Sequence, residues 1–287
     1  MSQIRIILIT VLSLLAFAAN SLLTRFALEE TPIDEASFIM LRVASGALFL
    51  WLYLAFKKEK TPYKAGSWLA AIALFIYAAS FTYGYGLIAA GTGALLLFGS
   101  VQITMTIAGY REGERLNKVQ LTGFTLALIG LVILMLPGIA APSFIGAVLM
   151  CISGIAWSIY TLQGRGANNP AAATAGNFIK AAPMAILLWL LVAATTSDPL
   201  NLANAGTIYA LLSGIVTSGI GYIIWYSVLP ELKATQAAIV QLSVPLLVTL
   251  AGVLLLNEAV TLRIFIASLA ILFGTVLVLK FKQSTKI

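Results

Sequence analysis

Two cations stand inside apolar stretches, at matching places in the two halves of the chain. Arg42 lies in the stretch 36–56, and Lys180 lies in the stretch 174–195. Each is about six residues from the start of its stretch, or about 9 Å along a helix axis. A cation at that depth can extend back to the water layer or face the interior of a helix bundle. We expect at least one of the two to face a solute pathway and to attract a carboxylate or another anionic group.

Uncharged polar and aromatic residues recur at helical spacing in the neighbouring stretches. Phe17 and Asn20 share one helix face, and Trp157 and Tyr160 share the equivalent face in the second half. A cavity with aromatic walls and a few amide or hydroxyl groups suits a small amphipathic organic solute. The predicted substrate-binding residues are therefore Phe17, Asn20, Arg42, Tyr83, Gln102, Trp157, Tyr160, Asn177, Lys180, Trp225 and Gln241.

The same residue types also have structural roles in membrane helices, and the sequence leaves these alternatives open. Amide side chains form hydrogen bonds between helices, and small residues such as Ser213 and Thr217 form packing seams. Tyrosine and tryptophan near helix ends anchor a protein at the membrane surface, as we expect for Trp51, Trp68 and Trp189.

The residues needed for bond-breaking chemistry are missing. The chain has no histidine, and its one cysteine, Cys151, lies in an apolar stretch. These counts exclude a histidine-ligated metal, a cysteine-based zinc site and a disulfide framework. A serine–lysine pair with Lys180 is formally possible, but no nucleophile can be identified. We predict no enzyme activity, no metal and no cofactor, and an ATP-driven pump would need a separate subunit because the chain has no nucleotide-binding motif.

All ten acidic residues lie near the ends of the apolar stretches. Proton-coupled carriers commonly use a carboxylate or a histidine within the membrane as a proton relay. The lack of such a group predicts a facilitator or exchanger, and it argues against a permanently cationic cargo. Glu114 and Glu258 precede two apolar stretches, and we expect each carboxylate to stabilise the helix start that follows it.

The composition is that of a membrane protein. Of the 287 residues, 61% are hydrophobic and 9% are charged, and the mean hydropathy is +1.01. So few charges cannot cover the surface of a soluble domain, which excludes a soluble enzyme, a nucleic-acid-binding protein and a disordered chain. The net charge of +7 comes from short basic runs between apolar stretches rather than from one basic face.

A helix that crosses a membrane needs about 20 mostly apolar residues. The sequence has ten such candidate spans, at about 4–24, 36–56, 67–88, 92–110, 117–137, 143–163, 174–195, 205–228, 234–256 and 260–280. The weakest break between spans is the glycine-rich segment 89–93. If the chain continued through this segment as one helix, that helix would have about 44 residues, too many for one crossing. The first span is similar to a secretory signal peptide that ends at Ala16-Phe17-Ala18, but a matching segment deep in the chain argues against cleavage.

The charges between the spans predict the orientation. If the N-terminus is cytoplasmic, thirteen lysines and arginines fall on the cytoplasmic side, and Arg25 and Arg263 fall on the other side. Cytoplasmic loops of membrane proteins carry an excess of lysine and arginine. Because the number of spans is even, both termini are predicted to be cytoplasmic.

The two halves of the chain resemble each other. Phe17 matches Trp157 at an offset of 140, and further matches at offsets of 138 and 144 are Arg42 with Lys180 and Glu114 with Glu258. Each copy has an odd number of spans, so the second copy must cross the membrane upside down, as in many secondary transporters. We predict an all-α integral membrane protein with ten transmembrane helices in two inverted five-helix repeats, residues 1–140 and 141–287.

Short motifs in and after the fourth and ninth spans, and glycines in the spans that follow, add a family resemblance. They include Ala94, Gly113-Glu114-Arg115-Leu116 and Gly130 in the first half, and Ala237-Ala238, Pro245, Asn257-Glu258 and Gly274 in the second. With the ten duplicated spans, these residues resemble the EamA family of the drug/metabolite transporter superfamily. One departure is Val101, which stands where the family has a proline in the fourth span, and it predicts unequal flexibility of the halves. The resemblance implies export or exchange of small metabolites, often amino acids, across a bacterial inner membrane.

The residues and the resemblance together predict a secondary transporter that works by alternating access through a central cavity between the repeats. Its expected substrates are amino acids or other zwitterionic or anionic solutes. The alternative is an uptake carrier for a nucleotide-like, phosphorylated or sugar metabolite. A passive channel and an intramembrane enzyme are remote alternatives, since the sequence has no ring of charges and no carbonyl filter. The expected partners are a small-molecule substrate and the lipid bilayer, with no nucleic acid, and the chain is expected to be a monomer or a weak dimer.

Overall fold

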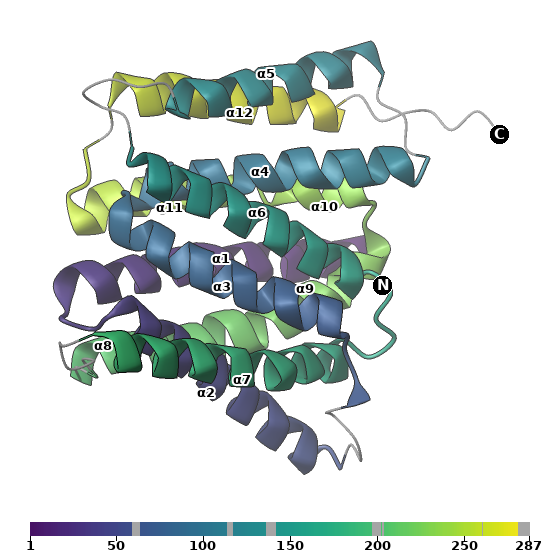
Figure 1. Ribbon diagram of the computed structural model, residues 1–287. Coiled ribbons are helices and arrows are strands. Elements are labelled where there is room, and N and C mark those ends of the chain that lie inside the picture. The colour runs from purple at the N-terminus through teal and green to yellow at the C-terminus, as the bar shows by residue number, and fades with distance from the viewer. Residues whose placement is uncertain are drawn as a thin grey trace.

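The computed structural model describes residues 1–58, 64–113, 117–135, 142–196, 202, 204–259 and 261–280. Every regular element within these ranges is a helix (Figure 1). The predicted boundary between residues 140 and 141 lies outside the described residues, as do the motif residues Glu114, Arg115 and Leu116.

The helices form ten spans. Spans one to five are α1 (Gln3–Glu30), α2 (Glu35–Phe56), α3 (Trp68–Leu87), α4 (Ala90–Arg111) and α5 (Lys118–Met135). Spans six and seven are α6 (Phe144–Gly164) and α7 (Pro170–Thr195). The eighth span runs through α8 (Asn204–Leu212), the π-helix η2 (Ser213–Ile220), α9 (Gly221–Val228) and the 3₁₀ turn η3 (Leu229–Glu231). The ninth span consists of α10 (Ala234–Val240) and α11 (Ser243–Leu256), and the tenth is α12 (Leu262–Lys280).

The lengths of these helices suit a membrane. Among the described residues, eight spans are long and apolar enough to cross one, and α12 adds a shorter apolar helix. The remaining span, α5, has 18 residues, or a length of about 27 Å. The predicted all-α class with ten spans is confirmed.

Short polar side chains determine where several helices begin. Ser2, Asp34, Ser67, Ser143 and Asn169 each precede a helix and accept a hydrogen bond from a backbone N–H of its first turn. Such caps satisfy donors that have no partner inside the helix. The spans therefore begin at defined residues, and they run in alternating directions across the bundle (Figure 1).

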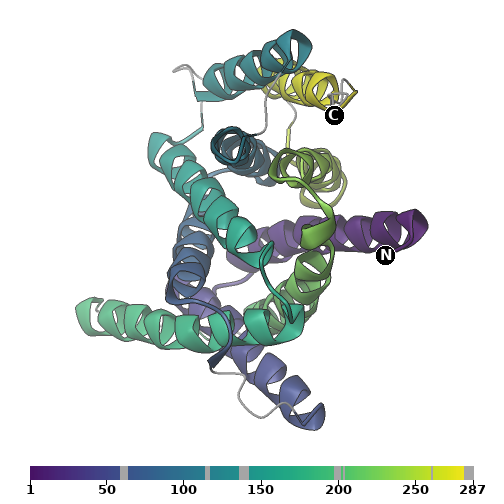
Figure 2. The same cartoon turned by 90° about the vertical axis from the view of Figure 1, so that its right-hand side faces the viewer.

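The contacts between helices repeat in inverted order. α3 packs along α6, and the eighth span, which is the counterpart of α3, packs along α1, the counterpart of α6. Three spans of the first half pack directly on their own counterparts: α2 on α7, α4 on α10 and α11, and α5 on α12. Figure 2, a view along the helices, shows the α5–α12 pair at one edge of the bundle. This pattern is that of two copies related by a two-fold axis, and it confirms the two inverted five-helix repeats.

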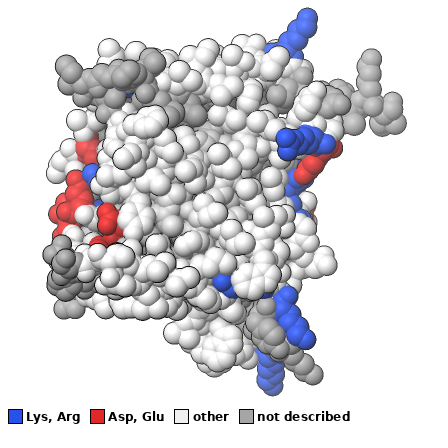
Figure 3. Space-filling view, in the orientation of Figure 1, with Lys and Arg blue, Asp and Glu red and all other residues white. Residues whose placement is uncertain are grey.

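The two ends of the bundle differ in charge. Lysine and arginine gather at the end that holds the N-terminus and the end of α12, and acidic residues gather at the opposite end (Figure 3). We call these ends the basic face (Lys57, Lys58, Lys64, Arg111, Lys118 and Arg165) and the acidic face (Glu29, Glu30, Asp34, Glu35 and Glu258). Between them, large apolar side chains such as Leu48, Leu187 and Leu250 are exposed, as expected for contact with lipid.

The second half contains irregular helices where the first half has regular ones. The ninth span is broken at Gln241 and Leu242, whereas its counterpart α4 is continuous. Pro245 explains the break, because proline has no N–H for the carbonyl of Gln241 and its ring clashes with that carbonyl. The counterpart of Pro245 in α4 is Val101, which keeps the helix intact. The π-helix η2 is a second irregularity, in the middle of the eighth span.

Candidate functional site

Several of the largest buried side chains meet at the centre of the bundle, and one of them is a cation. Arg42 is 1% exposed. Its Nε donates to Ser218 Oγ at 3.2 Å, and its Nη2 donates to the hydroxyls of Tyr77 at 3.2 Å and Tyr222 at 3.0 Å. Tyr77 and Ser218 lie near the middle of their spans, so the guanidinium lies at mid-depth. The alternative that Arg42 extends to the water layer is therefore wrong.

Asn20 joins this network from α1. Its Nδ2 donates to Tyr77 Oη at 3.1 Å, and its Oδ1 accepts from Ser213 Oγ at 2.6 Å and Thr217 Oγ1 at 3.1 Å. The Tyr222 hydroxyl also donates to that of Tyr77, at 3.2 Å. The seam formed by Ser213 and Thr217 is thus a hydrogen-bonding surface as well as a packing surface. Neutral groups from three spans, α1, α3 and the eighth, surround the one positive charge that α2 supplies.

The charge of Arg42 has no anionic partner among the described residues. None of the ion pairs between these residues includes Arg42, and its Nη1 is buried without a hydrogen-bond partner. The ring centroids of Tyr77 and Phe81 lie 5.2 and 5.0 Å from its Cζ, and these rings attract the cation without neutralising its charge. Because a buried charge without an opposite charge costs several kcal/mol, this arrangement favours an incoming anion.

Aromatic rings enclose the centre. The Trp157 ring lies 5.1 Å from Phe17, 4.9 Å from Tyr77 and 4.8 Å from Tyr222, measured between centroids. The cavity left between Trp157 and Tyr77 has a volume of about 10 Å³, which is at the lower limit for one water molecule. The centre is therefore closed in this conformation, and the rings must move before a solute can reach Arg42.

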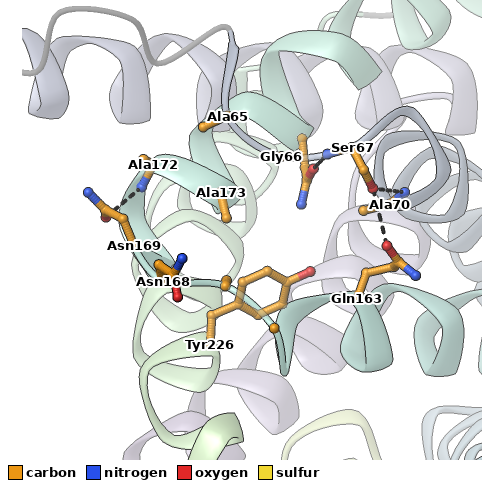
Figure 4. A pocket seen from close by; sticks show the side chains of 13 residues that line it. Ala65, Gly66, Ser67, Ala70, Gln163, Asn168, Asn169, Ala172, Ala173 and Tyr226 are labelled. Atoms are coloured by element: carbon orange, nitrogen blue, oxygen red, sulfur yellow. Dashed lines mark hydrogen bonds between the residues drawn. The ribbon is translucent and has the colours of Figure 1, made fainter.

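A hollow of about 450 Å³ opens at the basic face, and we call it the vestibule (Figure 4). Tyr226 projects into it, and its hydroxyl donates to the backbone carbonyl of Tyr160 at 2.7 Å. The Tyr160 ring lies 4.9 Å from the Tyr226 ring and 5.7 Å from the Tyr222 ring. Successive rings therefore connect the vestibule to Arg42. The other polar side chains of the lining are those of Ser67, Gln163, Asn168, Asn169 and Asn177.

An ion pair closes the acidic face. Arg25 Nε lies 3.3 Å from Glu258 Oε1, and the two side chains are only 15% and 11% exposed. Glu258 also accepts from the backbone N–H groups of Ala90 at 2.7 Å and Gly91 at 3.4 Å, at the start of α4. Arg25 Nη1 donates to the carbonyl of Tyr85 at 2.9 Å. We call these five residues the outer seal, which joins α1, α3, α4 and the segment after α11.

The outer seal corrects one expectation about Glu258. Glu258 was expected to stabilise the start of its own tenth span, but it caps α4 instead. Thr261 Oγ1 accepts from the N–H of Ile264 and caps α12.

A second hollow lies at the acidic face. It has a volume of about 300 Å³ and is lined by the α3–α4 link and by residues around the starts of α6 and α12, with no aromatic side chain.

Most of the predicted binding residues lie close to the Arg42 network. Phe17, Asn20, Trp157 and Tyr160 are among those described above. Trp225 is fully buried, and its ring lies 5.5 Å from that of Phe17. Gln241, at the break in the ninth span, accepts from Trp157 Nε1 at 2.6 Å. Residues from both repeats therefore meet at the centre.

The other predicted residues lie elsewhere. Asn177 lines the vestibule and accepts from the backbone N–H of Ser67 at 3.0 Å. Lys180 Nζ donates to the carbonyl of Ala65 at 2.5 Å, so the second cation lies towards the basic face. Gln102 is buried, and its Nε2 donates to Thr106 Oγ1 on the same helix at 3.5 Å. Tyr83 is half-buried near Asp34 and Glu35, at the acidic face.

Several residues that complete the site were not among the predicted ones: Tyr77, Ser218, Tyr222, Tyr226 and the Arg25–Glu258 pair. Part of the signal was present, because Ser218 and Tyr222 are four residues apart and share a helix face. The partner of each group was not visible, since Arg25 and Glu258 are 233 positions apart in the sequence.

Comparisons with known proteins agree with the fold and the repeats. The chain is 52% identical over 275 residues to the uncharacterized protein PA1977 of Pseudomonas aeruginosa, covering 96% of this chain and 94% of that protein. It is 28% identical over 274 residues to an uncharacterized transporter of Archaeoglobus fulgidus (93% and 94% covered) and 22% identical over 253 residues to the uncharacterized transporter YoaV of Bacillus subtilis (84% and 86% covered).

A solved crystal structure shares the fold, with a TM-score of 0.68, 17% identity and 96% of each chain covered. The model of the EamA-like transporter family matches twice, at residues 4–136 and 144–280, once in each repeat. These matches point to transport across a membrane rather than to enzyme activity. The chain belongs to the EamA-like transporter family.

Proposed function

We propose that this chain is a secondary transporter that carries small organic solutes, either amino acids or other zwitterionic or anionic compounds, by alternating access. The observation that carries the proposal is Arg42, a buried cation at mid-depth whose partners come from α3 in one repeat and the eighth span in the other. In transporters with inverted repeats, substrate sites lie near the midplane where the repeats meet. Irregular helices beside such sites are also common, and Gln241 and Ser218 lie in the two irregular segments.

The two faces supply the two gates of this mechanism. A solute enters the vestibule, displaces the rings of Tyr226 and Tyr160, and reaches Arg42. The outer seal between Arg25 and Glu258 then opens towards the acidic face. Because the repeats are inverted copies, the arrangement of one face can be adopted by the other in the alternate state.

The charge distribution supports an orientation. The basic face corresponds to the cytoplasm, because lysine and arginine accumulate on that side of membrane proteins. Both termini then lie in the cytoplasm, the vestibule opens inwards, and the outer seal faces outwards across a bacterial inner membrane. Export or exchange is the proposed mode of transport, as the family resemblance implies. We propose a small-molecule substrate and the surrounding lipid as the partners of a monomer or weak dimer.

Counterflow in proteoliposomes tests the transporter proposal. Liposomes that contain the purified chain are loaded with an unlabelled solute, and the uptake of the same radiolabelled solute is followed for a panel of amino acids and organic acids. A carrier shows uptake that saturates with concentration and is accelerated by solute inside. Uptake that rises linearly and ignores the internal solute would identify a passive channel and contradict the proposal.

A further inference from the structure

The charges around Arg42 restrict the net charge of the solute, and this inference rests on the proposed transport function. We propose that the central site takes a net monoanion: an organic acid with one carboxylate and no ammonium group to balance it. The inference narrows the substrate class, since amino acids and other zwitterions become poor ligands. This inference follows from the net charge at the centre when a monoanion, a zwitterion or a cation is bound there.

Three kinds of solute leave three different charges at the centre. Arg42 contributes one positive charge, and the groups that contact it, the hydroxyls of Tyr77, Tyr222 and Ser218, are neutral. A bound monoanion brings the total to zero, a zwitterion leaves it at plus one, and a cation raises it to plus two. Each uncompensated charge in a poorly solvated interior is unfavourable. Binding of a monoanion therefore removes the free-energy cost of the uncompensated charge of Arg42, and binding of a zwitterion or a cation does not.

The hydrogen-bonding groups also fit a carboxylate better than an ammonium. Arg42 Nη1 is a buried donor without a partner among the described residues, and it lies on the same planar fork as Nη2. The N–H groups of Nε and Nη2 already donate to Ser218, Tyr77 and Tyr222, so the two N–H groups of Nη1 are those that can donate charge-assisted hydrogen bonds to a carboxylate. An ammonium needs acceptors, and the amide oxygen of Asn20 already accepts from Ser213 and Thr217.

The rest of the solute must fit among aromatic rings. Phe17, Phe81 and Trp157 line the small cavity beside Tyr77. These rings offer apolar surface to a hydrocarbon or aromatic body attached to the carboxylate. We therefore expect an amphipathic acid rather than a small hydrophilic one such as formate.

Two matched series of compounds test the proposal on the purified full-length chain. The aromatic series is 3-phenylpropionate, its neutral amide, phenylalanine and phenethylamine, and the alkyl series is hexanoate, hexanamide, norleucine and hexylamine. Dissociation constants are measured by calorimetry. We expect an acid of at least one series to bind at least about tenfold more tightly than its amide, its amino acid and its amine.

Three variants show whether Arg42 produces the preference. Arg42→Met should lose the advantage of the acid over the amide, while Arg42→Lys should keep part of it with weaker binding. Lys180→Met is the matched control and should retain the full preference. Because Arg42→Met removes an uncompensated charge, it should melt no lower than the unmodified protein in the absence of ligand.

The results that overturn the proposal are distinct from a failure of transport. Equal or tighter binding of the amino acid, a preference that survives in Arg42→Met, or no binding of either acid would each refute a monoanion site. Saturable counterflow of phenylalanine with none of 3-phenylpropionate would leave the transporter intact and refute the charge assignment. Binding of the acid by Arg42 without any counterflow would support the charge assignment and contradict transport.

Discussion

The two repeats share an architecture but differ in where they carry charge and where their helices are irregular. The first repeat supplies Arg42 from a regular helix, and its α4 is continuous. The second repeat has Lys180 at the equivalent position, half-buried and bound to the carbonyl of Ala65. The second repeat also contains the π-helix η2 and the break at Gln241. The two repeats therefore share their packing but differ in content: the first holds the buried charge, and the second holds the irregular helical segments.

The two faces also differ. Tyr85 in α3 and Tyr226 in the eighth span occupy matching places near opposite ends of the bundle. The backbone carbonyl of Tyr85 belongs to the outer seal, whereas the ring of Tyr226 borders the vestibule. Matching tyrosines in the two inverted repeats therefore have different surroundings: Tyr85 lies at the closed acidic face, and Tyr226 lies at the vestibule of the basic face. In the proposed alternating-access mechanism, this conformation corresponds to the state whose vestibule opens at the basic face.

The largest expected effect is a difference in solute exchange between variants of Arg42 and variants of Lys180. Arg42→Gln should lower solute exchange by about 30-fold or more, because a lost partner of a buried charge costs about 2–5 kcal/mol. Lys180→Gln should change exchange by less than about threefold, since it breaks hydrogen bonds to backbone carbonyls near the surface. Exchange rates in proteoliposomes measure both. Equal losses in the two variants would show that the two cations do not differ in role.

The second effect concerns the outer seal. Glu258→Gln removes the charge that faces Arg25 and weakens the cap of α4, at a cost of about 2 kcal/mol. The ratio of open to closed conformations at the acidic face should therefore rise about 30-fold. Spin labels on the exposed residues Glu30 and Leu255 measure this ratio as the population with the longer distance.

Glu29→Gln is the matched control for the seal. Glu29 also pairs with Arg25, at 3.1 Å, but its side chain is 37% exposed. An exposed pair contributes about 0–1 kcal/mol, so the distance distribution should hardly change. If Glu29→Gln opened the face as much as Glu258→Gln did, the buried pair would not be the seal.

The third effect tests the break in the ninth span. Pro245→Ala allows α10 and α11 to join into one helix, which should slow exchange about tenfold by raising the barrier to movement at Gln241. The thermal midpoint should rise at the same time. Pro183→Ala, in the exposed part of α7, is the control and should leave exchange unchanged. Unchanged exchange in Pro245→Ala would mean that the break is not a hinge.

The smallest effect compares the two matching tyrosines. Tyr226→Phe removes the hydrogen bond to the carbonyl of Tyr160 and should destabilise the chain by about 1 kcal/mol. Tyr85→Phe should be neutral or slightly stabilising, because the hydroxyl of Tyr85 is buried without a hydrogen-bond partner among the described residues. Thermal unfolding in detergent measures the difference. A larger loss in Tyr85→Phe would show that Tyr85 has a role at the acidic face that its contacts do not reveal.

The sequence was sufficient for the features that depend on local pattern. Hydropathy located the spans, and the collinear matches at offsets of 140, 138 and 144 predicted the inverted repeat, because both signals are read along the chain without knowing which helices touch. The sequence did not predict the hydrogen-bond partners of Arg42. Tyr77 and Tyr222 lie on different helices, and the contact between these helices depends on the packing of the whole bundle. The role of Glu258 was misassigned for the same reason: the α4 start that it caps is near in space and distant in sequence.

The central claim is that one buried site becomes accessible from each face in turn. Ser21 lines the small cavity beside Tyr77 and is 1% exposed, so a cysteine at this position, in a chain with Cys151→Ser, reports access to the centre. Because aromatic rings close the centre in this conformation, labelling by a membrane-impermeant thiol reagent without solute should be slow from the basic face and nearly absent from the acidic face. Addition of a transported solute should raise labelling from the acidic face and lower it from the basic face. Labelling from one face only, whatever the solute, would contradict alternating access.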